Sequence, residues 1–261
     1  MTDEVVLFEA IGHVARLALN RPKAMNSLNR AILSELDCRL AEIASNDELR
    51  VVVLTGSGPA FCAGADLKEV IAGQSLAPGE PDFIDQSSRV LGRLRNFDRP
   101  VIAALNGVTM AGGLELAMCA DIVIAAESAR IGDAHANYGV YPGAGGAAIL
   151  PRLIPLNMAM YLLLTGKTLS AAEMMALGLV AEVHPDAELA DAAMALANQI
   201  AAKSPVALSR MKQVARASAD KSRDDALLHE QVMFRAHMRS HDLQEGLAAF
   251  AEKRVPSFIG R

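Results

Sequence analysis

The sequence predicts an α/β fold, and three observations support this prediction. Up to about residue 145, short apolar segments that lead into a glycine or a charged residue alternate with amphipathic helical segments, as in parallel strands that are connected by helices. After that point helical periodicity fills the chain, except at 179–185, which has a strand pattern. The core must be largely aliphatic, because 52% of the 261 residues are hydrophobic and only 4% are aromatic.

Strand patterns identify five segments in the N-terminal half. Alternating apolar residues over 4–10 and 13–20 predict two strands that are joined by a turn at Ile11 and Gly12. Longer apolar runs predict buried strands over 50–56, 99–107 and 121–127.

Helical spacing of apolar residues predicts the elements between these strands. In the first helix, over 26–44, apolar residues recur every three or four positions and Asn26 or Ser27 is the expected N-cap. A short helix over 66–73 begins at Asp66 as its cap, and two prolines and a glycine predict a loop over 74–83. The other helices are expected over 83–97, 112–120, 156–165, 170–177, 186–202, 205–218, 223–239 and 241–252. We expect one fold unit, with an α/β core over 1–200 and a C-terminal helical region over 201–261.

Charge and cysteine content limit the class of protein. The net charge is −5 and no basic cluster is present, which argues against nucleic-acid binding. The N-terminus has no signal-peptide pattern, and no apolar run reaches the length of a membrane span. The cysteines are odd in number and far apart in the chain, at Cys38, Cys62 and Cys119, which is typical of a reducing compartment. We therefore expect a cytoplasmic protein.

Two segments share one design, in which a strand ends, a glycine-containing loop follows and a helix begins. Free N–H groups at each helix start favour negative charge. Gly64, Gly112 and Gly113 would allow a ligand to approach the backbone closely. Two such N–H groups that face each other would form an oxyanion hole. One such motif alone is more often plain packing, whereas two in similar positions favour a binding site.

These segments resemble the crotonase, or enoyl-CoA hydratase/isomerase, superfamily. The resemblance runs from residue 19 to residue 258, and its most specific motifs are "AFCAGADLKE" (60–69), "NGVTMAGGLELAMCADIVIAAESARIG" (106–132) and "GVYPGAGG" (139–146). It implies a crotonase-like spiral of strand–helix repeats with a C-terminal helical trimerisation region. It further implies an acyl-CoA thioester as substrate and a homotrimer or a dimer of trimers. No cofactor is implied, since coenzyme A is part of the substrate.

Two other patterns suggest ligands but lack the required context. The glycine-rich segment 143–148 fits the dinucleotide fingerprint, but a proline precedes it and no acidic residue follows at the required distance. His237 and His241 are spaced as metal ligands on one helix face, but no third ligand is evident. We therefore expect neither a nicotinamide cofactor nor a metal ion.

The resemblance assigns roles to individual residues. By it, the backbone N–H groups of Ala65 and Gly112 bind the thioester oxygen and stabilise an enolate. Phe250 and Lys253 would reach coenzyme A from an adjacent subunit. The remaining positions expected near coenzyme A are Lys23, Ala24, Ala63, Asp66, Leu67 and Lys68. For each lysine, a solvated surface charge is an equally good interpretation.

Glu115 occupies the position of one of two catalytic glutamates in family hydratases, whereas His135 stands where the second is expected. An ion pair between them would raise the pKa of the histidine and lower that of the glutamate. Hydration of a 2-enoyl-CoA is the favoured reaction, with one group taking a proton from water and the other protonating C2. An enoyl-CoA isomerase, another enolate-forming enzyme such as a decarboxylase or hydrolase, and a non-catalytic acyl-CoA binder stay open. A structural role for His135 without catalysis also stays open. Tyr138 and Tyr141 either add hydroxyl groups to the site or serve only in packing.

Overall fold

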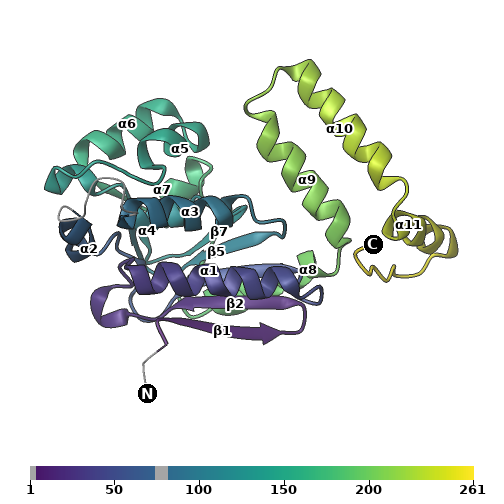
Figure 1. Ribbon diagram of the computed structural model, residues 1–261, viewed down its shortest axis with the longest axis horizontal. Helices are drawn as coiled ribbons and strands as arrows, with labels where there is room; N and C mark the ends of the chain where they lie inside the picture. Colours follow the sequence, from purple (N-terminus) through teal and green to yellow (C-terminus); the bar gives the residue numbers. More distant parts are fainter. Residues whose placement is uncertain (1–3, 74–81) are drawn as a thin grey trace.

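The computed structural model describes residues 4–73 and 82–261, and its centre is a six-stranded sheet in the order β1-β2-β3-β5-β7-β10 (Figure 1). β1 pairs antiparallel with β2, and the other neighbours pair in parallel. The strands of this sheet are β1 (Val6–Ile11), β2 (Val14–Leu19), β3 (Val51–Gly56), β5 (Val101–Leu105), β7 (Ile122–Ala126) and β10 (Glu182–His184).

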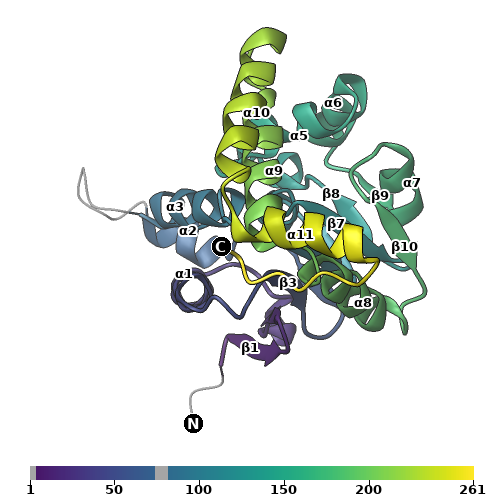
Figure 2. The same cartoon turned by 90° about the vertical axis from the view of Figure 1, so that its right-hand side faces the viewer.

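Alternation of side chains along these strands builds two cores on opposite faces of the sheet. In β5, Val101 and Ala103 face one core while Ile102 and Ala104 face the other. The first core is covered by α1 (Arg30–Ser45) and α3 (Phe83–Arg95). The second is covered by α8 (Leu189–Ala201), which lies on the other side of the sheet (Figure 2).

A second sheet has four strands in the order β4-β6-β8-β9. Three strands of the large sheet each continue directly into one strand of the small sheet, as β3 into β4, β5 into β6 and β7 into β8. Helices then return the chain to the large sheet, so the fold is a spiral of strand–helix repeats, as expected. The strands of the small sheet are β4 (Ala60–Cys62), β6 (Val108–Met110), β8 (Arg130–Gly132) and β9 (Thr168–Ser170).

The remaining helices cover the small sheet or extend from the core. Within the described residues, no helix has the length and apolar character that crossing a membrane requires. The remaining helices are α2 (Leu67–Gly73), α4 (Gly112–Ala117), α5 (Gly146–Leu153), α6 (Leu156–Thr165), α7 (Ala171–Ala176), α9 (Pro205–Ser218), α10 (Arg223–His237) and α11 (His241–Glu252), with 3₁₀ turns η1 (Pro22–Ala24) and η2 (His135–Tyr138).

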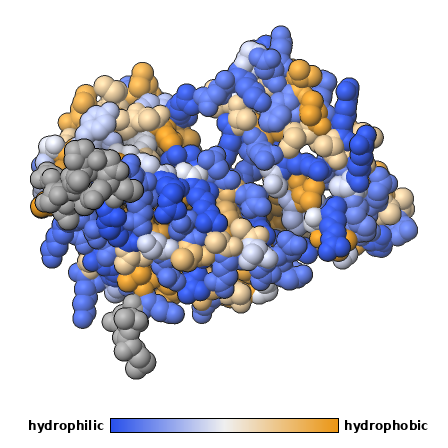
Figure 3. Space-filling view, viewed as in Figure 1, coloured by the Kyte–Doolittle hydropathy of each residue, from blue (hydrophilic) through white to orange (hydrophobic). Residues whose placement is uncertain are grey.

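Helices α9 and α10 form a pair that projects away from the sheet (Figure 1). Neither helix contains a buried residue. The pair is attached to the core through Asp121, whose carboxylate lies 2.6 Å from Lys212 and 2.8 Å from Arg216. Apolar side chains are visible on the surface over these C-terminal helices (Figure 3). On α10, Leu228 and Phe234 are exposed.

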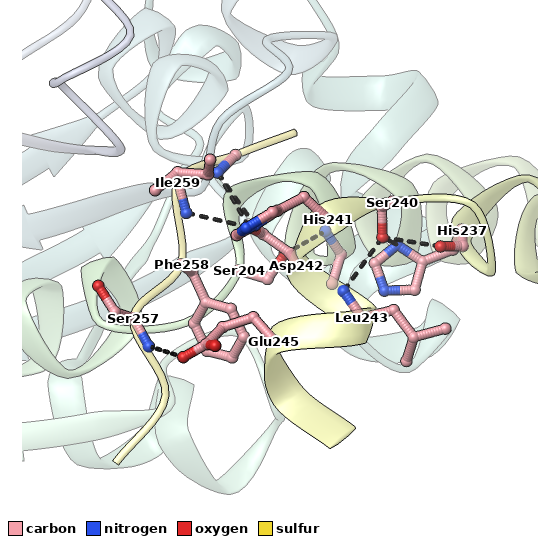
Figure 4. Close-up of polar contacts among 12 residues, drawn as sticks. Ser204, His237, Ser240, His241, Asp242, Leu243, Glu245, Ser257, Phe258 and Ile259 are labelled. Carbon is pink, nitrogen blue, oxygen red and sulfur yellow. Dashed lines mark hydrogen bonds and ion pairs between the residues drawn. The ribbon is translucent and has the colours of Figure 1, made fainter. Parts of the chain in front are cut away.

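The end of the chain is held by a buried carboxylate, that of Asp242 (Figure 4). Its Oδ2 accepts a hydrogen bond of 2.6 Å from the hydroxyl group of Ser204, which also caps α9. Its Oδ1 accepts the N–H of Ile259 at 2.9 Å. One side chain thereby joins the start of α9, the start of α11 and the C-terminal segment.

Several expected boundaries are wrong. Neither Asn26 nor Ser27 caps the first helix, since the side chain of Asn29 accepts the N–H of Ile32 at 2.9 Å. Asn26 has a positive φ of 56° and is fully buried, and its amide joins the 21–26 turn to the carbonyl groups of Ser57 and Ala60.

Other differences concern short elements. Strands β4, β6, β8 and β9 and helix α5 have no counterpart among the predicted elements. Of the loop that was expected over 74–83, residues 74–81 lie outside the described part of the chain. The last two residues of the expected loop belong to helix α3 instead, because Asp82 is its N-cap and Phe83 is its first residue.

Candidate active site

A cavity of about 420 Å³ lies where the parallel strands β4, β6 and β8 end. The residues that follow these strands line it, as expected at the carboxyl edge of a parallel sheet. Helices α2 and α3 supply an apolar wall that includes Val70, Phe83 and Leu91. Its titratable side chains include Glu115 on α4 and His135 in η2. The cavity therefore combines an apolar wall with a few polar groups, which is typical of a ligand site.

Two backbone N–H groups meet at this cavity, those of Ala65 and Gly112. A Cβ atom added to Gly112 would lie only 3.2 Å from the nitrogen of Ala65. Neither N–H donates a hydrogen bond to any described residue. Two free N–H groups this close are able to bind one oxygen atom.

The residue before Gly112 has an unusual backbone. Ala111 has φ 49° and ψ −119°, a conformation that favours glycine. Gly113 is required for packing, because a Cβ on it would lie 2.0 Å from the carbonyl oxygen of Cys62. The expectation that Gly113 allows ligand approach is therefore wrong, and it instead allows α4 to pack against β4.

Glu115 is 3% exposed, and its carboxylate is held at one oxygen. Oε1 accepts the backbone N–H groups of Ala144 and Gly146, each at 2.8 Å. Oε2 makes no hydrogen bond to the described residues. These N–H groups lie at the start of α5, where the helix dipole stabilises negative charge. Glu115 therefore keeps one oxygen available to a ligand.

His135 pairs with Asp133 rather than with Glu115. Its Nδ1 lies 2.9 Å from Oδ1 of Asp133, and the imidazole is 10% exposed. Burial by itself lowers the pKa of His135, but the hydrogen bond and charge of Asp133, with the nearby charge of Glu115, raise it above its ordinary value. His135 therefore makes its ion pair with Asp133, and Glu115, whose Oε1 contacts backbone N–H groups, raises the pKa of His135 through its charge, in the direction that an ion pair between them would have given.

The structure brings six of the predicted site residues to this cavity, and they are Ala63, Ala65, Leu67, Gly112, Glu115 and His135. Ala24 is half-buried. It lies near the cavity, because the N–H of the cavity-lining Ala63 donates a hydrogen bond of 3.0 Å to the carbonyl oxygen of Met25, the residue after Ala24. Lys23 and Lys68 are exposed. Tyr138 and Tyr141 line the cavity and are 76% and 81% exposed, respectively, so they form part of its rim.

Three other predicted residues lie elsewhere. Asp66 is not among the cavity-lining residues and pairs with Arg21 at 3.1 Å. Phe250 and Lys253 lie at the end of α11, on the opposite side of the molecule from α2 (Figure 1). Within 4–73 and 82–261, no three His, Cys, Asp or Glu side chains cluster as a metal ion would require.

Sequence reasoning missed Asp133, the wall formed by α3 and the role of 144–146. An aspartate two residues before a histidine was the available signal, because such a side chain often bonds to the backbone two positions later. The glycine-rich segment that resembles a dinucleotide fingerprint instead supplies the N–H groups that hold Glu115.

Comparison with known proteins identifies the family. The model of the enoyl-CoA hydratase/isomerase family matches residues 9–261. A probable enoyl-CoA hydratase of Mycobacterium bovis is 37% identical over all of both chains. The 2,3-dehydroadipyl-CoA hydratase of Escherichia coli is 38% identical over 95% of this chain and 96% of its own. The crystal structure of an enoyl-CoA hydratase from Bacillus anthracis superposes with a TM-score of 0.92 at 36% identity, covering 98% of this chain and 100% of that one.

These matches extend over the core, the cavity and the C-terminal helices alike. The chain therefore belongs to the enoyl-CoA hydratase/isomerase family, the crotonase superfamily, and is an enzyme of that family.

Proposed function

We propose that the protein hydrates a 2-enoyl-CoA thioester to a 3-hydroxyacyl-CoA. The observation that carries this proposal is the convergence of two free N–H groups, a carboxylate and an imidazole in one largely apolar cavity. A few polar groups in an apolar wall fix the orientation of a ligand. Relatives that are named hydratases over nearly the full chain length support the same reaction.

The first role in this mechanism belongs to the backbone. The N–H groups of Ala65 and Gly112 bind the thioester carbonyl oxygen. As water attacks C3, electrons move from the C2–C3 double bond onto that oxygen and form an enolate. Hydrogen bonds that strengthen as this charge develops lower the barrier, because they stabilise the transition state more than the substrate.

Proton transfer belongs to Glu115 and His135. The carboxylate of Glu115, through Oε2, takes a proton from the water whose oxygen bonds to C3. The imidazolium of His135 gives a proton to C2 as the enolate returns to a thioester. The proton on Glu115 then passes through solvent to His135, which restores both groups. The raised pKa of His135, set by Asp133 and Glu115 against the effect of burial, favours the protonated starting form.

In this proposal the coenzyme A part of the substrate extends from the cavity to the surface. Ala24, Ala63 and Leu67 line its path, and the exposed Lys23 and Lys68 face its phosphate groups. Asp66 contributes indirectly, since its pairing with Arg21 fixes the 63–67 segment. No cofactor is needed beyond the coenzyme A of the substrate.

We also propose that the protein is a homotrimer or a dimer of trimers. Leu228, Val232 and Phe234 on α10 are each more than half exposed, and neighbouring subunits would cover them. Such an assembly would allow Phe250 and Lys253 of one subunit to reach coenzyme A on the next. Light scattering should give three or six times the mass of one chain, and Phe234→Glu should reduce it. A stable monomer at micromolar concentration would contradict this assembly.

The cysteines support a cytoplasmic location, which we propose on that ground. All three are free, and Cys62 and Cys119 are buried. Burial raises the pKa of Cys62 to about 12 and that of Cys119 to about 11, so both remain unreactive thiols.

A panel of thioesters tests the proposed reaction. The protein is given 2-enoyl-CoA esters of several chain lengths, and products are identified by mass and NMR. We expect an added mass of one water, with the hydroxyl group on C3. Conversion of a 3-enoyl-CoA to a 2-enoyl-CoA without hydration of either would instead identify an isomerase. Binding without any turnover would contradict the proposed reaction.

A further inference from the structure

Asp133 is a buried carboxylate in the segment that joins β8 to η2. It is 1% exposed, and its Oδ1 accepts both the backbone N–H of His135 at 3.2 Å and the Nδ1 group at 2.9 Å. Its Oδ2 is buried and has no hydrogen-bond partner among the described residues. A buried carboxylate with one unpartnered oxygen is unfavourable unless an opposite charge compensates it.

The surroundings of Asp133 restrict what can compensate it. His135 is the residue that pairs with it at ion-pair distance. The start of α5 lies on the other side, since a Cβ on Gly146 would be 2.6 Å from Oδ2. The titratable groups that act on the His135 ring are Asp133 in the preceding loop and Glu115 on α4, both acidic. This arrangement retains a proton on the imidazole.

Geometry fixes where that proton is. Nδ1 faces Asp133, so its hydrogen is donated to Oδ1. Nε2 makes no hydrogen bond to the described residues, while the ring lines the cavity. We propose that Asp133 is a positioning residue, which keeps a hydrogen on Nδ1 and makes Nε2 the atom of His135 that exchanges protons with the ligand. This inference rests on the proposed function, in which His135 transfers a proton.

Asp133→Asn separates charge from shape. The amide oxygen of asparagine still accepts both hydrogen bonds, but it carries no charge to hold a proton on the imidazole. Asp186→Asn is the matched control, because Asp186 also accepts a backbone N–H, that of Ser128 at 3.1 Å, in a loop that does not line the cavity.

Histidine NMR titration gives the first readout, and it does not depend on turnover. The His135 signals are assigned with a His135→Gln variant of the full-length protein. In Asp133→Asn, the titration of His135 should move to lower pH by about one pH unit or more. It should be unchanged in Asp186→Asn. A wild-type titration in Asp133→Asn would overturn the proposal.

Steady-state kinetics give the second readout. Asp133→Asn should lower kcat by about 10²-fold or more, with KM within a few-fold of wild type, and should move the basic limb of kcat/KM to lower pH. An unchanged pH profile would overturn the proposal even if the protein is less stable. If the wild type hydrates no thioester, the proposed function fails, and the NMR titration still decides whether Asp133 sets the proton on His135.

Discussion

Oε1 of Glu115 lies 2.8 Å from the backbone nitrogen of Gly146, the first residue of α5. The same glycine faces Asp133, because a Cβ added to it would lie 2.6 Å from Oδ2 of that residue. One helix start therefore contacts the carboxylate that we assign as the base and approaches the carboxylate that holds His135. Both positions depend on the absence of a side chain at Gly146.

Gly146→Ala should displace this helix start. The new methyl group would clash with Asp133 and Pro142, so we expect a loss of about 1–3 kcal/mol in stability and a lower kcat. Gly92→Ala, within α3, is the control, because nothing lies within 4 Å of its Cβ position. It should raise stability by about 0.5–1 kcal/mol and leave activity unchanged. Thermal unfolding and the hydration assay measure both effects, and equal behaviour of the two variants would contradict this assignment.

Gly112→Ala tests the proposed oxyanion hole. The added Cβ would lie 3.2 Å from the nitrogen of Ala65 and would obstruct an oxygen between the two N–H groups. We expect kcat to fall by about 10²-fold or more. Ala65→Gly, which keeps its N–H group, should reduce kcat much less. Wild-type kcat in Gly112→Ala would show that the thioester oxygen binds elsewhere.

The pH dependence of turnover should report on His135. The pKa of its imidazolium is raised above the ordinary value, so the donor form persists to higher pH and activity falls as pH rises through that pKa. His135→Ala should lower kcat by about 10²-fold and remove this basic limb. His184→Ala is the control, because His184 also pairs with a carboxylate, that of Glu182 at 2.9 Å, but does not line the cavity. A basic limb that persists in His135→Ala would assign it to another group.

The activity of a variant with a carboxyl group at position 135 should depend on the charge of the residue at position 133. His135→Glu places a carboxyl group beside Asp133, and like charges disfavour ionisation of both. The repulsion raises the pKa of the new carboxyl group, but the ordinary pKa of a carboxyl group lies below that of an imidazolium, and the pKa of His135 is itself raised, so the hydration rate of this variant should still peak at lower pH than that of wild type. Asp133→Asn/His135→Glu removes the repulsion, which lowers the pKa of the new carboxyl group and leaves less of its proton-donating form, so it should be the less active of the two variants at neutral pH. The opposite order would contradict the contact between these positions.

The main elements of the large sheet could be predicted from the sequence, and those of the small sheet could not. β3 and β5 are continuous apolar runs because helices cover both of their faces. β4, β6 and β8 have only three residues each, which is too short for any periodicity to emerge. Asn26 looks like a helix cap because its residue type favours both caps and positive φ.

The cavity-lining positions of the candidate site could be predicted only in part. Motifs identified Ala65, Gly112, Glu115 and His135, which follow strand ends and so converge in space. Asp133 could not be predicted from a motif, because its contact with His135 depends on burial and on the conformation of its own turn. Phe250 and Lys253 are distant from the cavity within one chain, and their role stays a prediction about the assembly.

Hydration of crotonyl-CoA by wild type and by Glu115→Gln tests the central claim most directly. Loss of the conjugated-thioester absorbance is followed, and binding of the ester is measured in parallel by calorimetry. The amide of glutamine can still accept the N–H groups of Ala144 and Gly146 but cannot take a proton from water. We predict hydration by wild type, a loss of about 10²-fold or more in Glu115→Gln, and nearly unchanged binding. Equal turnover in the two proteins, or no turnover by wild type, would contradict the account.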